Sequence, residues 1–543
     1  MLAGTPVILL REGTTREEGK DAQHANIEAA RTVSDALRST LGPRGMDKML
    51  VEPSGDIVIT NDGATILRSM EVEHPAAKML VEVAKTQDQE CGDGTKTSVI
   101  LAGELLRSAM DLLDQGIHPT LITQGYRLAA DRATSRLNEG ARAVPRDQTE
   151  VLNKVAMTSM MSKGVSSDRA FLAGLTVRAV RAIAEPAGAG WKCDRKNIQL
   201  VKRQGGNVDS TELVEGLILD KPVLHVGMPK EVDRAHVALM EGALEVRKGE
   251  VTREVKITDP RAMEAFLAEE DRMLRAMVEA VSRSGANVVV CEKGIDEVAQ
   301  QYLARAKVLA VSQVKRSDLE LLSKATGADL LSRWEELEPS SLGQASRVEE
   351  RKVGEEKMTF FLGCQGAKAV SLLIRGGTEH VVDEAERSLV DAISTVGLVI
   401  EDGAVTTGAG ASAIEVSSDL RGYADSVGGR EQMAVQAFAD AMDVLPMTLA
   451  ENAGMDKVGA LLELRRRHRL GEKDLGIDVL AGRLADMSEV AVEPVRVGRQ
   501  AILSATEAAV MILRVNDTIA AKGGHGAGGP SSGPSMEPGP HKV

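Results

Sequence analysis

Aromatic side chains are scarce in this chain of 543 residues, because Phe, Trp and Tyr together make up only 2% of it. A surface that stacks nucleic-acid bases needs such rings. The chain also lacks a basic excess, since 66 Lys and Arg face 80 Asp and Glu and give a net charge of -14. Proteins that mainly neutralise phosphate backbones show the opposite balance. We therefore expect no nucleic-acid partner.

Cysteines and long apolar runs are also missing. The four cysteines, Cys91, Cys193, Cys291 and Cys364, lie too far apart for a metal site or a redox motif, and we expect them to be small buried residues. No segment is long and apolar enough to span a membrane, and the start, MLAGTPVILLREGTT, has no basic stretch of the kind that opens a signal peptide. The sequence predicts a soluble, cytoplasmic protein with no membrane partner.

The residues that are present suit a large protein with aliphatic cores. Hydrophobic residues make up 43% of the chain, and 22 of them are Met, whose flexible thioether fills irregular gaps. A chain of 543 residues is too long for a single core, so we expect roughly three or four domains.

Three local patterns in the first 120 residues indicate elements that end in glycine turns. Apolar residues recur at helical spacing over 26–41, before Gly42-Pro43. A β-branched strand over 57–60 runs into the turn Asn61-Asp62-Gly63, and a helical pattern follows. The segment 95–114 has an apolar helical face and ends near Gly116. The expected order is helix, strand, turn and helix.

The middle of the chain has a different pattern. Apolar strands over 287–291, 308–311 and 328–331 alternate with helical stretches over 295–306 and 317–326. This alternation predicts an α/β domain with a largely parallel sheet.

A glycine-rich hexapeptide, Gly92-Asp93-Gly94-Thr95-Lys96-Thr97, comes directly before the helix expected over 95–114. Unpaired N–H groups and the helix dipole favour an anion there, the carboxylate could hold Mg²⁺, and the hydroxyls could donate to phosphate. The alternative is that Asp93 and Thr95 only cap a helix. The usual P-loop is excluded, because Gly-Lys-Ser and Gly-Lys-Thr do not occur.

A second glycine cluster spans Gly408–Ala413 and loosely matches a dinucleotide fingerprint. That match would imply a nicotinamide-dependent oxidoreductase. However, Glu401-Asp402-Gly403 interrupts the approach, so no clean apolar strand is expected to run into Gly408. This interruption counts against the oxidoreductase alternative.

Three further polar residues look ordinary when periodicity alone is considered. Asp391 falls on the polar side of a helix whose apolar face includes Leu389 and Ile393, so it resembles a solvated acid. By the same reasoning Asp62 is a turn residue and Lys163 is a surface lysine.

Five segments of the chain follow one another in the order TLGPRGMDKML, NDGATIL, GDGTKTSVILAGELL, IRGGTEHVVDEAERSL and TLAENAGMD. In this order they resemble the group II chaperonins, the thermosome family of archaea and their eukaryotic cytosolic relatives. The resemblance covers nearly the whole chain. It implies a multi-domain α+β chaperonin fold, with a mostly helical equatorial domain, a small intermediate α/β domain, and an apical α/β domain with a helical protrusion. The implied divisions are equatorial 1–148 and 403–523, intermediate 149–215 and 367–402, apical 216–366 with a lid near 244–277, and a disordered tail 524–543.

The resemblance also assigns roles to residues. It implies ATP and Mg²⁺ as cofactors, Asp93 as the metal ligand, and Asp391 and Asp62 as catalytic residues, with Lys163 sensing the γ-phosphate. The implied nucleotide-binding residues are Leu41, Gly42, Pro43, Gly92, Asp93, Gly94, Thr95, Lys96, Thr97, Lys163, Gly408, Ala409, Gly410 and Glu493. The implied partners are other chaperonin subunits in a stacked double ring and non-native client proteins.

Three residues of the expected nucleotide site depart from the family pattern. Lys96 stands where Thr is usual, Ala409 interrupts three glycines, and Glu493 replaces an Asp. These departures leave open a divergent structural ring subunit with weak or no ATP hydrolysis.

The expected lid carries an apolar stripe, for which core packing and client contact are both possible explanations. Its members are Met263, Phe266, Leu267, Met273, Leu274 and Met277.

Overall fold

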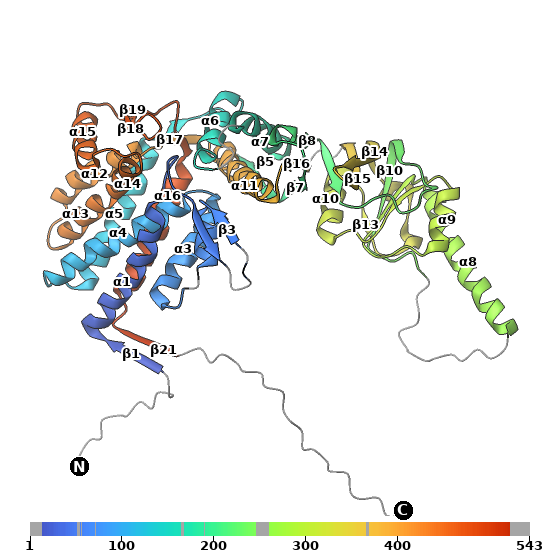
Figure 1. Cartoon of the computed structure of the whole chain (residues 1–543), viewed down its shortest axis with the longest axis horizontal. Coiled ribbons are helices and arrows are strands. Elements are labelled where there is room, and N and C mark those ends of the chain that lie inside the picture. The colour runs from blue at the N-terminus through green and yellow to red at the C-terminus, as the bar shows by residue number, and fades with distance from the viewer. Residues whose placement is uncertain are drawn as a thin grey trace, which may run out of the picture.

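The computed structural model describes residues 14–51, 55, 57–70, 72–163, 168–188, 190–245, 260–364 and 369–521. The predicted tail, 524–543, and part of the predicted lid, 246–259, lie outside the described residues. The elements gather in three parts along one long axis (Figure 1). We call them the helical part, the middle part and the sheet part.

The helical part contains both ends of the described chain. Its helices are α1 (Gly19–Arg38), α2 (Gly63–Ser69), α3 (Pro75–Cys91), α4 (Thr95–Asp114), α5 (Pro119–Glu139), α12 (Ala411–Ser426), α13 (Glu431–Met442), α14 (Val444–Asn452), α15 (Lys457–Arg469) and α16 (Val495–Leu513). The helix predicted over 95–114 is confirmed at both ends, and the helix predicted over 26–41 begins earlier and ends at Arg38.

One aliphatic core joins the two halves of the helical part. It contains residues from Ile27 to Leu137 and from Ala413 to Leu513. Its few rings include Tyr126 and Phe438, whose centroids lie 5.6 Å apart in an edge-to-face arrangement. The two ends of the described part of the chain also meet, because β1 (Thr14–Glu18) pairs with β21 (Asp517–Ala521) in an antiparallel ribbon.

The middle part packs three helices against a small sheet (Figure 1). The helices are α6 (Thr149–Ser159), α7 (Arg169–Ile183) and α11 (Glu379–Asp402), and the strands are β7 (Ile198–Gln204), β16 (Val370–Gly376) and β8 (Glu212–Val214) in that order. The chain therefore passes through the middle part once on its way to the sheet part and once on its return.

The sheet part is built on a seven-stranded sheet. Its strands are β9 (Gly216–Leu219), β10 (Glu231–Met240), β11 (Val288–Cys291), β12 (Leu309–Val311), β13 (Leu330–Leu331), β14 (Gly343–Val353) and β15 (Glu356–Cys364). The helices α8 (Pro260–Ser284), α9 (Glu297–Arg305) and α10 (Arg316–Thr326) accompany the strands. β10 pairs in parallel with β11 and β13, and β11 with β12, but β14 pairs antiparallel with β10 and β15, and β15 with β9. The prediction of a largely parallel sheet is therefore wrong for the whole sheet, because β9, β14 and β15 fall outside the segment that carried the alternating pattern.

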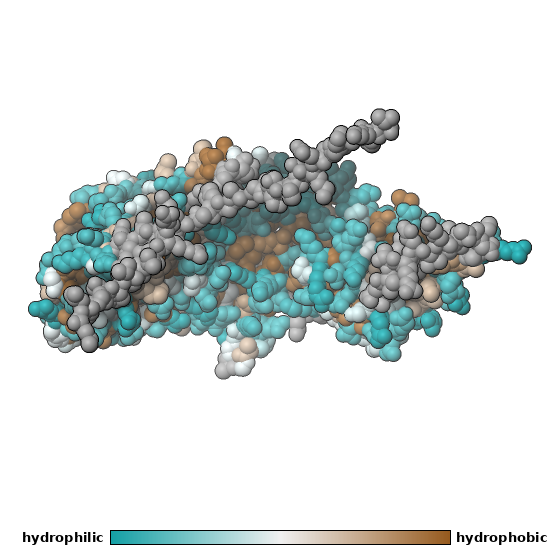
Figure 2. All heavy atoms as spheres, turned by 90° about the horizontal axis from the view of Figure 1, so that it is seen from below, coloured by the Kyte–Doolittle hydropathy of each residue, from teal (hydrophilic) through white to brown (hydrophobic). Residues whose placement is uncertain are grey.

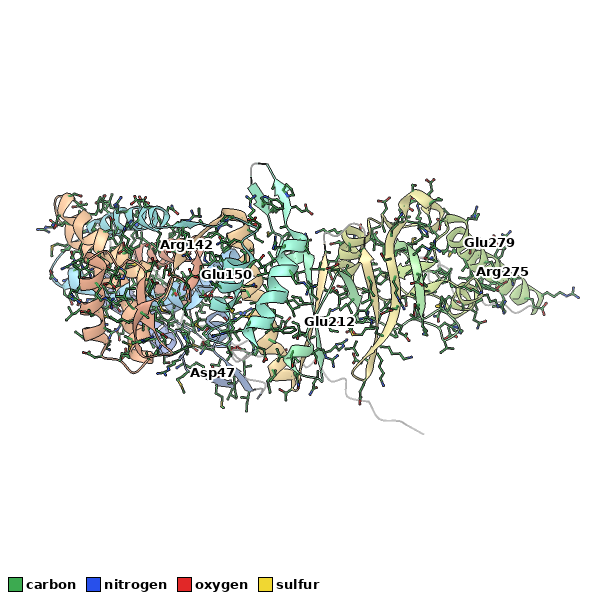
Figure 3. All side chains as sticks on the ribbon, turned by 90° about the horizontal axis from the view of Figure 1, so that it is seen from above. Asp47, Arg142, Glu150, Glu212, Arg275 and Glu279 are labelled. Atoms are coloured by element: carbon green, nitrogen blue, oxygen red, sulfur yellow. The ribbon has the colours of Figure 1, made fainter. Side chains whose placement is uncertain are left out.

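Helix α8 divides the predicted apolar stripe. Leu274 is 4% exposed in the sheet-part core and Met277 packs against that core, whereas Phe266, Leu267 and Met273 are about half exposed. The side chain of Met263 lies outside the described ones. The labelled Arg275 and Glu279 show how far α8 lies from the helical part (Figure 3). Core packing therefore explains Leu274 and Met277, and client contact stays a prediction for the exposed Phe266, Leu267 and Met273.

Short strands connect the remaining segments. They form the hairpins β2 (Lys48–Val51) with β3 (Ile57–Thr60), β5 (Glu185–Ala187) with β6 (Gly190–Lys192), and β18 (Leu475–Asp478) with β19 (Arg483–Asp486), and the sheet of β20 (Val492–Pro494), β17 (Ala404–Thr407) and β4 (Arg142–Ala143). The strand predicted over 57–60 is confirmed.

Most of the cysteines are buried and most of the visible surface is polar. Cys91, Cys291 and Cys364 are buried as expected, but Cys193 is partly exposed. Polar side chains cover most of the face seen in Figure 2. Within the described ranges, no helix is both long and apolar enough to cross a membrane.

Candidate functional site

One cavity between the helical and middle parts collects nearly all of the predicted site residues. Its lining includes Leu41, Gly42, Pro43, Asp62, Asp93, Gly94, Thr95, Lys96, Thr97, Lys163, Asp391, Gly408, Ala409, Gly410 and Glu493. Of the predicted residues, only Gly92 is not part of this lining. The fold thus brings together loops that lie more than 400 residues apart in the chain.

Three helices begin at this cavity. α4 and α12 each start after a glycine in the left-handed region, Gly94 with φ 79° and Gly410 with φ 83°. Neither N-terminus has a side-chain cap among the described residues. Their first N–H groups are therefore available to an anion, and both helix dipoles favour one.

The strand β17 leads straight into Gly408, contrary to the expectation of an interrupted approach. It pairs antiparallel with both β20 and β4. A dinucleotide fold needs a parallel βαβ unit at this position. The oxidoreductase alternative thus fails because of strand direction, and not because the strand is missing.

Asp62 caps the third helix, α2. Its Oδ2 accepts hydrogen bonds from the Thr65 backbone N at 2.8 Å and from Thr65 Oγ1 at 2.7 Å. Burial raises the pKa of Asp62, but the charge of Lys163 and the two Thr65 bonds outweigh it and hold that pKa below its usual value. Asp62 is a turn residue, as its pattern suggests, and it is also a charged wall of the cavity.

Asp93 lies between the left-handed glycines Gly92 and Gly94. Its Oδ1 accepts from the Gly94 N at 2.6 Å, and Gln87 Nε2 donates to its carbonyl oxygen at 2.8 Å. Burial raises the pKa of the carboxyl. Over the part of the chain that the structure describes, no group of three or more His, Cys, Asp and Glu is arranged to hold a metal. A hard cation at Asp93 would therefore need oxygens from a bound ligand, as is usual for Mg²⁺.

Lys163 and Asp391 form a buried ion pair at the edge of the cavity. Their side chains are 6% and 15% exposed, and Lys163 also donates to the Arg387 carbonyl at 3.1 Å. The prediction from periodicity, a surface lysine and a solvated acid, is wrong for both. The periodicity of α11 separates its polar face from its apolar face. It cannot show that another part of the chain, the end of α6, covers part of that polar face.

The charges in the cavity are unbalanced. Five acidic side chains, Asp62, Asp93, Asp391, Asp478 and Glu493, line it together with Lys96 and Lys163. Burial, and then the charges of Asp93 and Asp62, raise the pKa of Asp391 to about 8 despite its lysine partner. The acid-rich wall favours an anionic ligand only if that ligand carries a cation with it.

The amine of Lys96 faces oxygen atoms of the protein. Its Nζ donates to the Thr40 carbonyl at 2.9 Å and to Asn61 Oδ1. Burial, and then the charge of Lys163, lower the pKa of Lys96 to about 8. Lys96 therefore ties the loop at Leu41 to the start of α2, a role that the sequence did not suggest.

Other positioning residues were missed because nothing in their sequence pattern assigns them a role. Asn452, at the end of α14, donates from Nδ2 to the carbonyls of Arg38 at 2.9 Å and Leu41 at 2.8 Å. The β18–β19 region forms an apolar wall of the cavity through Ile477, Val479, Leu480 and Met487. Only the three-dimensional arrangement identifies these residues.

The second glycine turn is tightly packed. A Cβ at Gly408 would lie 2.2 Å from Glu493 Oε1, so a side chain there would displace the Glu493 carboxyl. Ala409 has a φ of 53°, a left-handed conformation that strains any residue with a Cβ. Burial, and then the charge of Asp93, raise the pKa of Glu493 to about 7.

Gly92 lies beside the cavity and contacts α11. A Cβ at this position would come within 2.4 Å of Ser394 Cβ. Gly92 lies at the junction between the helical and middle parts, and its role as a nucleotide-binding residue stays a prediction.

Comparisons with known proteins agree with this architecture. Residues 33–523 match the TCP-1/cpn60 chaperonin family. The chain is 54% identical to thermosome subunit beta of Archaeoglobus fulgidus, over 98% of this chain and 99% of the relative, and 53% identical to the thermosome subunit of Pyrococcus abyssi, over 96% and 95%.

A solved structure is also similar. The open-state monomer of a group II chaperonin from Methanococcoides burtonii matches with a TM-score of 0.61 and 42% identity, over 78% of this chain and all of that one. The chain therefore belongs to the TCP-1/cpn60 chaperonin family and is a group II chaperonin subunit of the thermosome type.

Proposed function

We propose that this subunit is a cytoplasmic ATPase that assembles with other chaperonin subunits into a stacked double ring and encloses non-native proteins beneath a built-in lid. The observation that carries the proposal is the buried pair of Lys163 and Asp391, which the middle part contributes, together with the end of α6, to a cavity lined mainly by the helical part. ATP chemistry at that cavity would couple the two parts.

The cavity suits a nucleotide as substrate. The uncapped N-termini of α4 and α12 and the ammonium group of Lys163 would receive the phosphates. The apolar wall of the β18–β19 region would cover the base, as apolar side chains commonly do in ligand sites. Thr95 and Thr97 add hydroxyl donors at the start of α4.

Asp93 is the residue that we assign to Mg²⁺. It is a buried carboxylate next to an uncapped helix N-terminus, and the acid-rich wall around it calls for a cation to accompany an anionic substrate. Bound Mg²⁺ would neutralise charge on the phosphates. The protein's own contribution is to hold Asp93 still, because the Gly94 N–H donates to its carboxylate and Gln87 donates to its backbone carbonyl.

Asp391 is assigned as the group that orients and deprotonates the attacking water. Because burial raises its pKa, the Asp391 carboxylate is a stronger base than an ordinary aspartate. Lys163 holds the carboxylate in place and has a further N–H available for a phosphate oxygen. Asp62 contributes negative charge that keeps Lys163 protonated.

The test is ATP turnover by the assembled particle with Asp391→Asn, which keeps the shape of the side chain but removes the base. We expect nucleotide binding to persist and turnover to fall by roughly 10²- to 10⁴-fold. Glu379→Gln, at the exposed start of the same helix, removes one charge and serves as the control. Turnover by Asp391→Asn at the wild-type rate would contradict the assignment.

The same assay addresses the structural-subunit alternative. It is favoured by the Lys96 amine, which binds protein oxygens, and by the strained Ala409. An assembled wild-type particle without Mg²⁺-dependent turnover would support that alternative.

A further inference from the structure

Helix α3 ends at Gly92, where the absence of a side chain does more than allow the turn. Gly92 is the C-cap residue in the left-handed conformation, and its N–H donates to the Asp88 carbonyl at 2.9 Å. Gly327 ends helix α10 in the same way, and a Cβ there would meet nothing within 4 Å. At Gly92 a Cβ would lie 2.4 Å from Ser394 Cβ and 2.5 Å from its Oγ. The missing side chain therefore makes room for α11.

The contact between Gly92 and Ser394 lies close in sequence to Asp93 and Asp391, the two residues that we assign to Mg²⁺ and to the attacking water. Ser394 follows Asp391 by three positions on α11, so the two side chains project from neighbouring positions on the helix surface. Gly92 directly precedes Asp93. Any change in the distance from α11 to Gly92 therefore changes the distance from the proposed base to the proposed Mg²⁺ ligand.

We infer that the bare backbone of Gly92 is the stop against which α11 rests, and that this contact sets how deeply Asp391 enters the cavity. Gly92 is thus a positioning residue that acts through α11 and does not contact substrate. The inference rests on the proposed function, because it concerns the placement of the proposed base.

Neighbouring contacts explain why α11 cannot absorb a clash locally. Arg195 Nη1 donates to Ser394 Oγ at 3.2 Å, and Leu398 packs against Cys91 and Val497. Arg496 pairs with Glu401 at 3.0 Å near the end of the helix. With this end held, relief of the clash requires movement of the segment that carries Asp391.

The expected displacement follows from the contact distance. Ordinary van der Waals contact begins at 3.4 Å, and the added Cβ would lie at 2.4 Å, so α11 must withdraw by about 1 Å. A misplacement of about 1 Å in a catalytic group can cost roughly 10²-fold in rate.

The experiment measures ATP turnover and nucleotide affinity of the assembled particle. Gly92→Ala should lower kcat by about 10²-fold and leave nucleotide affinity within about twofold. Adding Ser394→Gly removes the clashing Cβ and should restore most of the rate, whereas adding Ser394→Ala keeps that Cβ and should not. Gly327→Ala introduces the same left-handed strain without a contact and should turn over like wild type. Failure of Ser394→Gly to rescue, or a normal rate for Gly92→Ala, would overturn the inference.

A second measurement does not depend on hydrolysis. Hydrogen exchange of α11 in the nucleotide-free particle should be faster in Gly92→Ala and return to the wild-type rate in the double variant with Ser394→Gly. If wild type shows no turnover, the proposed function fails, but exchange still decides whether Gly92 is the stop for α11. Should Gly92→Ala not assemble, Ser394→Leu enlarges the other partner and should give the same faster exchange, and unchanged exchange would reject the contact.

Discussion

The turn at Gly92–Thr97 and the turn at Gly408–Gly410 both deliver an uncapped helix N-terminus to the same cavity, but they differ in what surrounds it. The first turn carries Asp93 and Lys96, and its glycines leave room for α11 and for Val497. The second carries no charge of its own, and it is packed against Glu493 and strained at Ala409. We infer that the first turn supplies chemistry and the second mainly supplies shape.

We expect the largest effect from removing the charge of Asp93 in the first turn. Asp93→Asn keeps the acceptor for the Gly94 N–H but removes the charge, so kcat/KM should fall by about 10²- to 10³-fold and the Mg²⁺ requirement should rise. Titrating turnover against Mg²⁺ measures both. Asp47→Asn changes the same charge at an exposed position (Figure 3) and should have no such effect. An unchanged Mg²⁺ requirement in Asp93→Asn would argue against a metal ligand.

A smaller effect concerns the acid beside the second turn. Because burial raises the pKa of Glu493 to about 7, its contribution to stability is full below about pH 4.5 and is lost as the pH rises through 7. Glu493→Gln has no carboxyl to ionise, so the nucleotide-free variant should lose less stability than wild type between pH 5 and 8, by about 1–3 kcal/mol.

Thermal unfolding across that pH range measures the difference. Glu507→Gln, on the exposed face of α16, should show the wild-type pH dependence. Parallel curves for Glu493→Gln and wild type would mean that Glu493 is charged without penalty.

The smallest effect tests the strain in the second turn. Ala409→Gly should stabilise the folded subunit by about 0.5–1 kcal/mol, because glycine adopts a φ of 53° without a steric penalty and the extra freedom of the unfolded chain offsets only part of that gain. Ala485→Gly in β19, where φ is not positive, should destabilise it by a similar amount. A loss of stability in Ala409→Gly would show that the methyl group is needed for packing.

Local signals predicted the elements well where a periodic face and a turn residue coincide. The helix over 95–114 and the strand over 57–60 have the expected bounds because glycines or an Asn-Asp-Gly turn stand at their ends. The sheet part was less predictable, because β14 and β15 form a long antiparallel hairpin beyond the alternating segment. Pairing direction depends on the return path of the chain, which no local window contains.

The cavity was even harder to predict from local sequence than the sheet part. The turn at Gly92–Thr97 could be singled out from residue types, but Asp391 and Lys163 acquired roles only through the resemblance to group II chaperonins. Their burial arises where two elements more than 200 residues apart meet. Asn452 lies in the segment TLAENAGMD that carries the resemblance, but no role was assigned to it, since an asparagine that bonds two backbone carbonyls looks like any helix-terminal residue in the sequence. The domain boundaries predicted from the sequence stay predictions.

The split core of the helical part also affects the synthesis of this subunit. Residues of the first half of the core end at Leu137, and those of the second half begin at Ala413, 276 positions later. At about 5–20 residues per second, a ribosome needs roughly 15–55 s to cover that interval. The sheet part, which is continuous in sequence, can fold during this time, whereas the faces of α4 and α5 that pack against α13 and α16 have no partner until the second half is made. A newly made subunit therefore carries unpaired apolar surface of its own before its helical part is complete.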